Sequence, residues 1–296
     1  MHFEKLQRGE IIACVGGLLL AIAVFFVVPV AAALVMSGTD FDIYALADLR
    51  NVRFVGLDNY VQLLRRPLFW QALVNTLFFV VVGVPLSVAV SLVAAPLLNS
   101  PLARFKGLYR TALFVPVVTT LAAVAVVWRF LLHTRYGLLN YGLSSLGFSP
   151  IDWLGNPRWA MPAIMLLSVW KNFGYNMIIL LAGLQAIPSE QYEAARLDGA
   201  GTWAVFRHIT LPSLGPMLLM VSILTMAAHF QLFAEPYVMT QGGPAQRTVT
   251  VLYLMYEEGF KWWSLGTGSA VAFVLFLFMF GFTLLQVKAS RRWGTA

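Results

Sequence analysis

Residues 72–95 read ALVNTLFFVVVGVPLSVAVSLVAA, a continuous run without one charged side chain. A bilayer core of about 30 Å needs about 20 apolar helical residues to cross it, so this run is long enough to span a membrane. Its apolar residues are continuous rather than alternating, which favours a helix over a strand of a membrane barrel. The stretch therefore predicts a transmembrane helix.

The composition of the whole chain agrees with that prediction. Of 296 residues, 59% are hydrophobic and only 11% are charged, whereas soluble domains carry about 25% charged residues. This excludes a disordered chain and a single large water-soluble globule. The one cysteine, Cys14, excludes an internal disulfide and a thiolate metal cage. The net charge of +7 is spread over loops instead of one surface, so no nucleic-acid partner is expected.

Six runs of the required length predict an all-α polytopic membrane protein. The first is too long for the apolar part of a signal peptide, which has about 7–15 residues, and is expected to stay in the chain as a helix. The predicted spans are 11–35, 72–95, 109–131, 160–185, 213–234 and 267–287. Three long loops, at 36–71, 132–159 and 235–266, offer room for contact with a second protein.

Lysine and arginine placement predicts that both termini are cytoplasmic. With that orientation the inner segments hold ten basic residues in about 60 positions, and the outer segments hold eight in about 90. Tryptophans near the predicted outer ends of spans would anchor the chain at the interface. The chain divides into an N-terminal helix with its first outer loop (1–70), a core of five helices (71–288) and a cytoplasmic tail (289–296).

The loop at 188–212 combines two short helices with a sharp turn. Ser189 is expected to cap the first helix, and Gly199 to end it in the left-handed conformation that glycine adopts at little cost. A second helix is expected from Thr202, and Pro212 stands where the next span begins. From these residues alone, an amphipathic connector resting among lipid headgroups is equally open.

The same loop resembles the Glu-Ala-Ala coupling loop of bacterial ABC import permeases. The matching residues are Glu193, Ala194, Ala195, Asp198, Gly199, Ala200, Phe206, Leu211 and Pro212. The resemblance extends to Gly56-Leu57-Asp58-Asn59-Tyr60, Trp170-Lys171 and Thr240-Gln241-Gly242-Gly243-Pro244, and is greatest to the carbohydrate-uptake permeases of the maltose and glycerol-phosphate type.

The resemblance implies a transporter subunit rather than an enzyme, in the bacterial cytoplasmic (inner) membrane. Its implied partners are a related second permease forming a heterodimer, two ATPase subunits, an extracytoplasmic solute-binding protein and membrane lipid. ATP and Mg would be bound by the ATPases, and this chain would hold no cofactor. The sequence agrees, because a phosphate-binding P-loop needs a Gly-Lys dipeptide and the chain has none.

Polar residues inside predicted spans are costly and mark candidate solute contacts. The candidates are Lys171, Asn172, Tyr175, Asn176, His229, Gln231 and Phe233, which would offer amide, charged and aromatic groups to a sugar. A structural role is also open, since Lys171 could extend to the interface and the asparagines could join helices. Asn75 is expected to join helices, and Gly242-Gly243-Pro244 to form a tight outer turn.

Two other classes of protein are weaker interpretations of the sequence. An ion-coupled carrier usually places carboxylates within the membrane, but Glu10 and Glu235 lie only at the borders of the predicted spans. A membrane-embedded enzyme would need converging acid and base groups, and no catalytic set is recognisable. The four histidines lack metal-ligand spacing, so no metal site is expected. Glycerol phosphate or another polyol remains an alternative solute.

Overall fold

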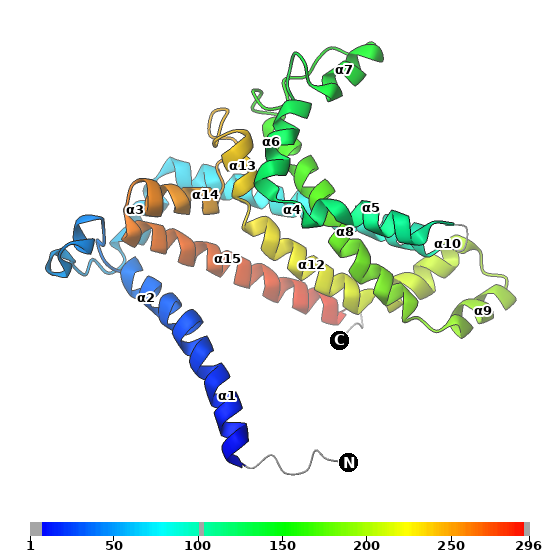
Figure 1. The fold of residues 1–296 in the computed structure, drawn as a ribbon, viewed down its shortest axis with the longest axis horizontal. Helices are drawn as coiled ribbons and strands as arrows, with labels where there is room; N and C mark the ends of the chain where they lie inside the picture. Colours follow the sequence, from blue (N-terminus) through cyan, green and yellow to red (C-terminus); the bar gives the residue numbers. More distant parts are fainter. Residues whose placement is uncertain (1–7, 101–103, 293–296) are drawn as a thin grey trace. The chain divides into compact units, whose positions relative to one another are not determined.

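The computed structural model describes residues 8–100 and 104–292, and all regular elements in these ranges are helices, apart from one isolated bridge between Thr39 and Phe54. The elements (Figure 1) are α1 (Arg8–Ile22), η1 (Ala23–Val27), α2 (Val28–Ser37), η2 (Tyr44–Leu46), η3 (Leu49–Asn51), α3 (Asp58–Arg65), α4 (Pro67–Asn99), α5 (Lys106–Val118), α6 (Leu121–Leu131), α7 (Leu138–Ser145), α8 (Ala160–Gln185), α9 (Ser189–Leu197), α10 (Thr202–Val205), η4 (Phe206–Thr210), α11 (Leu211–Ser213), α12 (Gly215–Phe230), α13 (Ala234–Met239), α14 (Val251–Tyr256), η5 (Glu257–Lys261) and α15 (Leu265–Arg292). The predicted all-α class is confirmed.

Five segments of the described chain are long and apolar enough to cross a membrane, and a sixth is bent. The five are Val15–Ser37, Pro67–Asn99, Ala160–Gln185, Gly215–Met239 and Leu265–Ser290. The bent pair is α5 with α6, so the chain has up to six spans if that pair counts as one.

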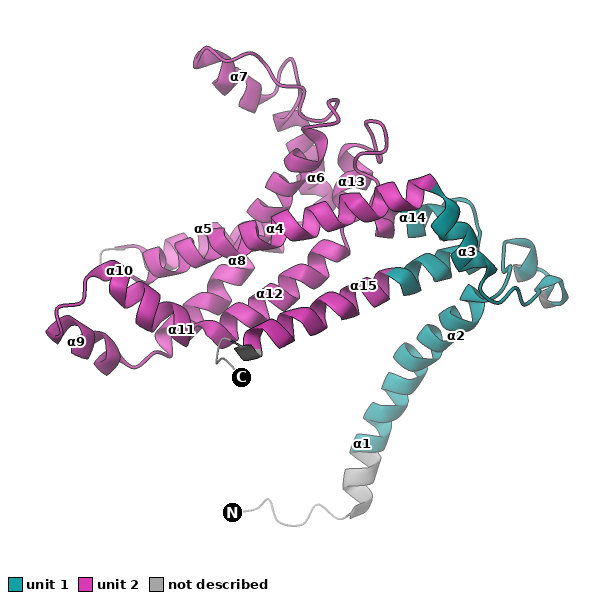
Figure 2. Ribbon diagram, turned by 180° about the vertical axis from the view of Figure 1, so that it is seen from behind, with its two compact units in different colours: residues 1–66, 254–274 teal, residues 67–253, 275–296 magenta. Residues whose placement is uncertain are grey.

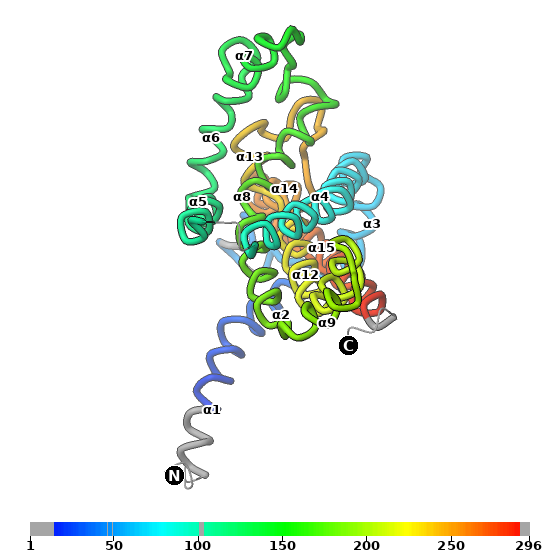
Figure 3. The backbone as a smooth tube through the Cα atoms, turned by 90° about the vertical axis from the view of Figure 1, so that its right-hand side faces the viewer, coloured from blue at the N-terminus to red at the C-terminus, as the bar shows by residue number. Residues whose placement is uncertain are grey.

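The third predicted span, 109–131, is not the continuous helix that was expected. Helix α5 ends at Val118 and α6 starts at Leu121, with a bend of 99° between them that is visible where α6 leaves α5 (Figure 3). Thr119 and Thr120 are extended, with ψ angles of 148° and 122°. β-Branched threonines favour extended backbone, but an uninterrupted apolar run gives no sign of such a break.

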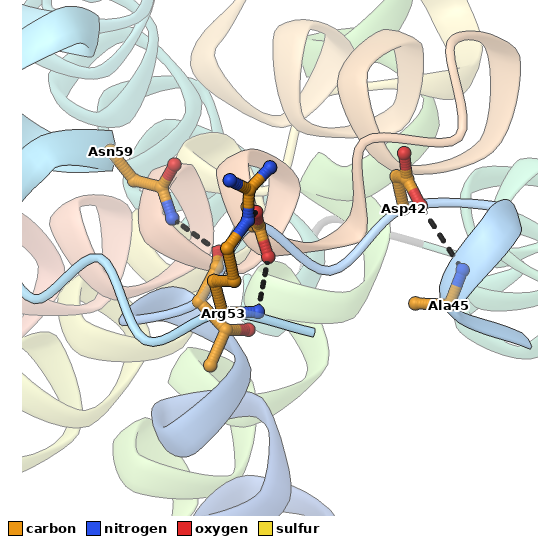
Figure 4. Close-up of polar contacts among 6 residues, drawn as sticks. Asp42, Ala45, Arg53 and Asn59 are labelled. Carbon is orange, nitrogen blue, oxygen red and sulfur yellow. Dashed lines mark hydrogen bonds and ion pairs between the residues drawn. The ribbon is translucent and has the colours of Figure 1, made fainter. Parts of the chain in front are cut away.

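The described chain forms two compact units, drawn in different colours in Figure 2: residues 1–66 with 254–274, and residues 67–253 with 275–296. In the first unit the segment that follows α2 folds back on the end of that helix. Asn59 donates from one amide group to the carbonyls of Ser37 and Thr39, both at 2.8 Å, and Figure 4 shows it beside Arg53. The Gly56–Tyr60 segment thus closes the C-terminal end of α2.

In the second unit α4, α8 and α12 pack side by side around two apolar clusters. One cluster gathers on the first half of α8, from Met161 to Val169, and includes Phe79 of α4. The other gathers on the second half, from Met177 to Leu184, with α4 and α12. The residues of α8 between these clusters are the polar ones, Lys171 to Asn176, called the polar turn below.

Candidate functional site

The 188–212 loop is built almost wholly from backbone interactions. Helix α9 ends at Leu197, and Gly199 follows with φ of +75°. The amide of Ala200 donates to the carbonyl of Ala195 at 2.9 Å, and that of Gly199 to Arg196 at 3.1 Å. This is the Schellman arrangement, in which a left-handed glycine satisfies the last carbonyls of a helix. The predicted role of Gly199 in ending the helix is confirmed.

The start of the same helix differs from expectation. Ser189 was expected at the capping position, but it is the first helical residue, and Pro188 precedes it without a side-chain cap. The serine hydroxyl can cap only from outside the first turn. Pro188 takes the capping position instead, with an extended ψ of 134°, and α9 begins one residue earlier than predicted.

The second arm of the loop starts at Thr202, as predicted, and runs through α10, η4 and α11. The hydroxyls of Tyr192 and Thr210 are 3.2 Å apart and join the two arms. The rings of Trp203 and Phe206 stack with centroids 5.6 Å apart. The two arms therefore form a small folded element rather than an extended connector.

The tip of this element is exposed and carries large apolar side chains. Leu197 is 89% exposed and Trp203 is 70% exposed. Of the nine residues matched to the coupling loop, Glu193, Ala194, Asp198, Gly199 and Pro212 are exposed, and Ala195, Ala200, Phe206 and Leu211 are partly buried. Exposed leucine and tryptophan beside exposed carboxylates are typical of a surface that contacts another protein.

The polar turn of α8 faces the other way, into the helix packing. Asn176 is buried and donates to the hydroxyl of Thr225 on α12 at 2.9 Å and to that of Ser87 on α4 at 3.3 Å. Asn172 is partly buried and donates to Ser168 of its own helix at 2.9 Å. The two bonds of Asn176 join α8 to α4 and α12, as polar side chains do between membrane helices, whereas the bond of Asn172 stays within α8.

Lys171 is 8% exposed, and its ammonium group lies at the end of α5. It donates to the carbonyls of Pro116 at 3.0 Å, Val117 at 3.3 Å and Thr119 at 2.9 Å. The last carbonyls of a helix have no partner within that helix and carry partial negative charge. The ammonium therefore satisfies the carbonyls exposed by the break between α5 and α6.

On α12, His229 is buried against α4. Its Nδ1 lies 2.8 Å from the carbonyl of Thr225, and its ring centroid is 4.9 Å from that of Phe79. A Cβ atom at Gly83 would lie 2.8 Å from the histidine Cδ2, so this close approach requires glycine.

The remaining candidate solute contacts are more accessible. Tyr175 is 46% exposed, Gln231 is exposed, and Phe233 is partly buried with its ring stacked on Tyr237 at 5.2 Å. The structure thus separates the seven candidates into two groups. Lys171, Asn176 and His229 are buried in helix contacts, and the other four can be reached from outside the described chain.

Three features were not identified from the sequence. Glu235 was placed at a span border, but it is 6% exposed within the candidate span Gly215–Met239. Ser87 and Thr225, whose hydroxyls accept hydrogen bonds from Asn176, could not be singled out from the sequence, because small hydroxyl residues are common in apolar helices. The break at Thr119–Thr120 was also missed.

The turn after α13 is anchored on α4. Asn75 was expected to join helices, but its amide donates to the loop carbonyls of Gln246 at 2.9 Å and Val249 at 2.8 Å, so that expectation was wrong. An amide side chain satisfies backbone carbonyls wherever they lie nearby and buried. Gly242 has φ of +81°, as a tight turn requires.

In the ranges 8–100 and 104–292 no three metal-ligating side chains gather into a possible metal site.

Named relatives cover nearly the whole chain. The lactose transport system permease protein LacF of Rhizobium radiobacter is 36% identical over 275 residues, 91% of this chain and 90% of that protein. The trehalose/maltose transport system permease protein MalF of Thermococcus litoralis is 37% identical over 80% of each chain. The sn-glycerol-3-phosphate transport system permease protein UgpA of Yersinia pestis is 34% identical over 91% of this chain and 90% of that protein.

The fold is shared with solved transporters. A chain in the crystal structure of a bacterial alginate ABC transporter, in complex with an alginate pentasaccharide-bound periplasmic protein, superposes with a TM-score of 0.80 at 20% identity over 96% of this chain and 94% of that one. The family model described as a binding-protein-dependent transport system inner membrane component matches residues 19–294. The chain therefore belongs to this family, and it is a membrane-spanning permease subunit of an ABC transporter and not an enzyme.

Proposed function

We propose that this permease imports a sugar or sugar-like solute into the cytoplasm of a bacterium, driven by separate ATPase subunits that dock on the 188–212 loop. The exposed tip of that loop carries the proposal, because Leu197 and Trp203 present apolar surface without cover from their own chain. The sequence match to the coupling loop covers both arms and the Gly199 turn. ATP closure of the ATPases would move the loop and shift the pore between outward-facing and inward-facing states.

The proposed assembly has this chain and a related permease in the inner membrane, two ATPases that bind ATP and Mg, and a solute-binding protein outside. One six-span subunit supplies half of a pore, which is why a second permease is needed. The family description supports dependence on a binding protein, and family membership weighs against the ion-coupled carrier as an alternative.

For the solute we propose a neutral di- or oligosaccharide. Relatives are named for lactose, trehalose/maltose and arabinooligosaccharides. A phosphorylated solute would need free cationic groups, but the ammonium of Lys171 already bonds three carbonyls. The accessible candidates Asn172, Tyr175, Gln231 and Phe233 would line the pathway, offering amides and an aromatic face to sugar hydroxyls and ring carbons.

The coupling role is tested by replacing Gly199 with tryptophan in the complete transporter. No atom lies within 4 Å of a Cβ at Gly199, so the change acts through the left-handed backbone and the docking surface rather than through packing. We expect the variant to insert normally but to lose solute-stimulated ATP hydrolysis and uptake in proteoliposomes.

Gly201 provides the matched control, because it also has open space around its Cβ but lies at φ of −71°, where any residue fits. Gly201→Trp should retain clearly more coupled hydrolysis than Gly199→Trp. Wild-type coupling in the Gly199 variant would remove the proposed role of this loop.

The solute class is tested by competition. Uptake of labelled lactose, maltose and trehalose is compared with that of sn-glycerol 3-phosphate in the same vesicles with the cognate binding protein. Selective uptake of the phosphate ester would contradict the neutral-sugar proposal while leaving the coupling proposal intact. Uptake of any of these solutes without ATPase subunits would contradict the coupling proposal.

A further inference from the structure

The end of α5 is a helix terminus in the middle of a membrane protein. Lys171 stands near the midpoint of α8, a 26-residue span. Its three hydrogen bonds reach carbonyls of the last turn of α5 and of the first residue of the break. An ammonium group has three donors and no acceptor, so every donor of Lys171 is used at this one place.

The backbone carbonyls at the break need a hydrogen-bond donor from the protein, because the hydrocarbon of a bilayer offers none. Unsatisfied carbonyls do not persist in the bilayer core, and non-helical backbone at that depth is tolerated only where protein groups or a water-filled cavity satisfy it. Thr119 covers part of the requirement with its hydroxyl, which donates to the Pro116 carbonyl at 2.6 Å. The carbonyls of Val117 and Thr119 are left for the lysine.

A second contact holds α5 against α8 one turn further along. A Cβ at Gly174 would overlap the carbonyl of Leu113, so the two backbones meet there directly. Gly174 and Lys171 are three residues apart and share a face of α8. The helix α5 is therefore pinned to α8 at two points, its body by the glycine and its end by the lysine.

The location of this clamp coincides with the gap between the two apolar clusters. The helix α6 contributes Ala125 to the cluster on the first half of α8, whereas Leu113 of α5 packs against the cluster on the second half. The two arms of the broken span thus contact different clusters.

From these contacts we propose that Lys171 is a positioning residue that keeps the third span broken at Thr119–Thr120 by capping α5, and that it does not contact the solute. Lys171 would then affect transport only indirectly, through the position of α5 and α6. This inference concerns the geometry of the break and does not depend on which solute is carried.

The break is measured by the distance between spin labels on its two sides. Tyr109 and Val127 are exposed, on α5 and α6 respectively, and they receive cysteines in a Cys14→Ser background, since Cys14 is the only cysteine. With a 99° bend, straightening the pair into one helix would lengthen the separation by roughly 9 Å. Lys171→Met should move the distance distribution toward that longer value, and Lys171→Arg should keep the short distance because arginine retains several donors.

A second variant tests the inference if the Lys171→Met protein does not accumulate in the membrane. Thr119→Ala with Thr120→Ala removes the residues that favour extended backbone but leaves the lysine. The short distance should persist in this variant. A straightened third span there would overturn the inference, as would an unchanged short distance in Lys171→Met.

Transport separates positioning from direct contact. In the complete transporter, Lys171→Met should lower maximal uptake by about ten-fold or more, the scale expected from losing hydrogen bonds to a charged group, and Lys171→Arg should recover most of it. The concentration of loaded binding protein at half-maximal uptake should stay the same. The preference between lactose and maltose should also stay the same, and a changed preference in the arginine variant would mean solute contact and overturn the inference.

Discussion

The 188–212 loop and the polar turn of α8 are held in opposite ways. The loop owes its shape to backbone bonds within a few residues of Gly199, and it leaves its side chains exposed. The polar turn sits in a regular helix, and its buried side chains Lys171 and Asn176 are fixed by bonds to α4, α5 and α12. The loop thus leaves its side chains available for contact with another protein, whereas the polar turn uses its polar groups within the helix packing.

The largest loss of stability is expected at the interior contact of α4 with α12. In Gly83→Ala the new methyl would lie 2.8 Å from Cδ2 and 3.0 Å from Nε2 of His229. Overpacking of this kind costs about 1–3 kcal/mol. We expect a clearly lower midpoint of thermal unfolding in detergent.

The control for that variant is Gly107→Ala in α5, where no atom lies within 4 Å of the added methyl. It should be neutral or slightly stabilising, because alanine favours a helix more than glycine does. Equal midpoints of thermal unfolding for the two variants would contradict this expectation. They would show that the contact between α4 and α12 accommodates the added methyl group without loss of stability.

A somewhat smaller loss is expected from Asn176. Replacing it with alanine removes the bonds to Thr225 and Ser87, which within a membrane protein are together worth about 1–2 kcal/mol. A double-mutant cycle with Thr225→Val measures the shared part. Additive losses, with no coupling between the two sites, would mean that Asn176 stabilises the bundle by packing alone.

In the loop, the link between the two arms should matter less. Tyr192→Phe removes the contact with Thr210, and an ordinary hydrogen bond contributes about 0.5–1.5 kcal/mol. The expected change in unfolding midpoint is therefore small and below that of Asn176→Ala. Tyr141→Phe serves as the control, since that ring is 76% exposed. If Tyr192→Phe lowered the unfolding midpoint more than Asn176→Ala does, the loop and not the polar turn would contribute more to stability.

The smallest effect on stability is expected at Leu197. Because the side chain is 89% exposed, Leu197→Ser should change the free energy of unfolding by no more than about 0.5 kcal/mol. The same change should nevertheless weaken binding of the ATPase subunits in a pull-down from detergent. A variant that is unstable yet binds normally would show that the leucine belongs to the fold and not to the docking surface.

These two regions also differ in how far the sequence could predict them. The turn at Gly199 follows from local rules, since a glycine after a run of helix formers ends the helix whatever surrounds it. The apolar runs likewise predicted five spans within about five residues of their observed ends, and the polar residues inside the fourth run marked the polar turn of α8.

What the sequence could not supply were the partners of the polar residues. From the sequence, Lys171 could be a solute contact or an interface anchor. Its actual partners are backbone carbonyls, which have no sequence signature. The break at Thr119–Thr120 was hidden for the same reason, since its stabilising group lies more than 50 residues away along the chain. Asn75 was assigned to a helix contact because the loop it holds is distant in sequence.

Two turns of the second unit differ in how well they would tolerate an insertion. Residues 240–250 include four left-handed positions, at Gln241, Gly242, Ala245 and Gln246, and are tied to α4 through Asn75. The segment that follows α7 is exposed from Leu146 to Pro150, with Gly147 at φ of +84° and no atom within 4 Å of a Cβ there. An epitope inserted beside Gly147 would leave the bundle untouched, and antibody access to it in intact cells would report which side of the membrane this end of the molecule occupies.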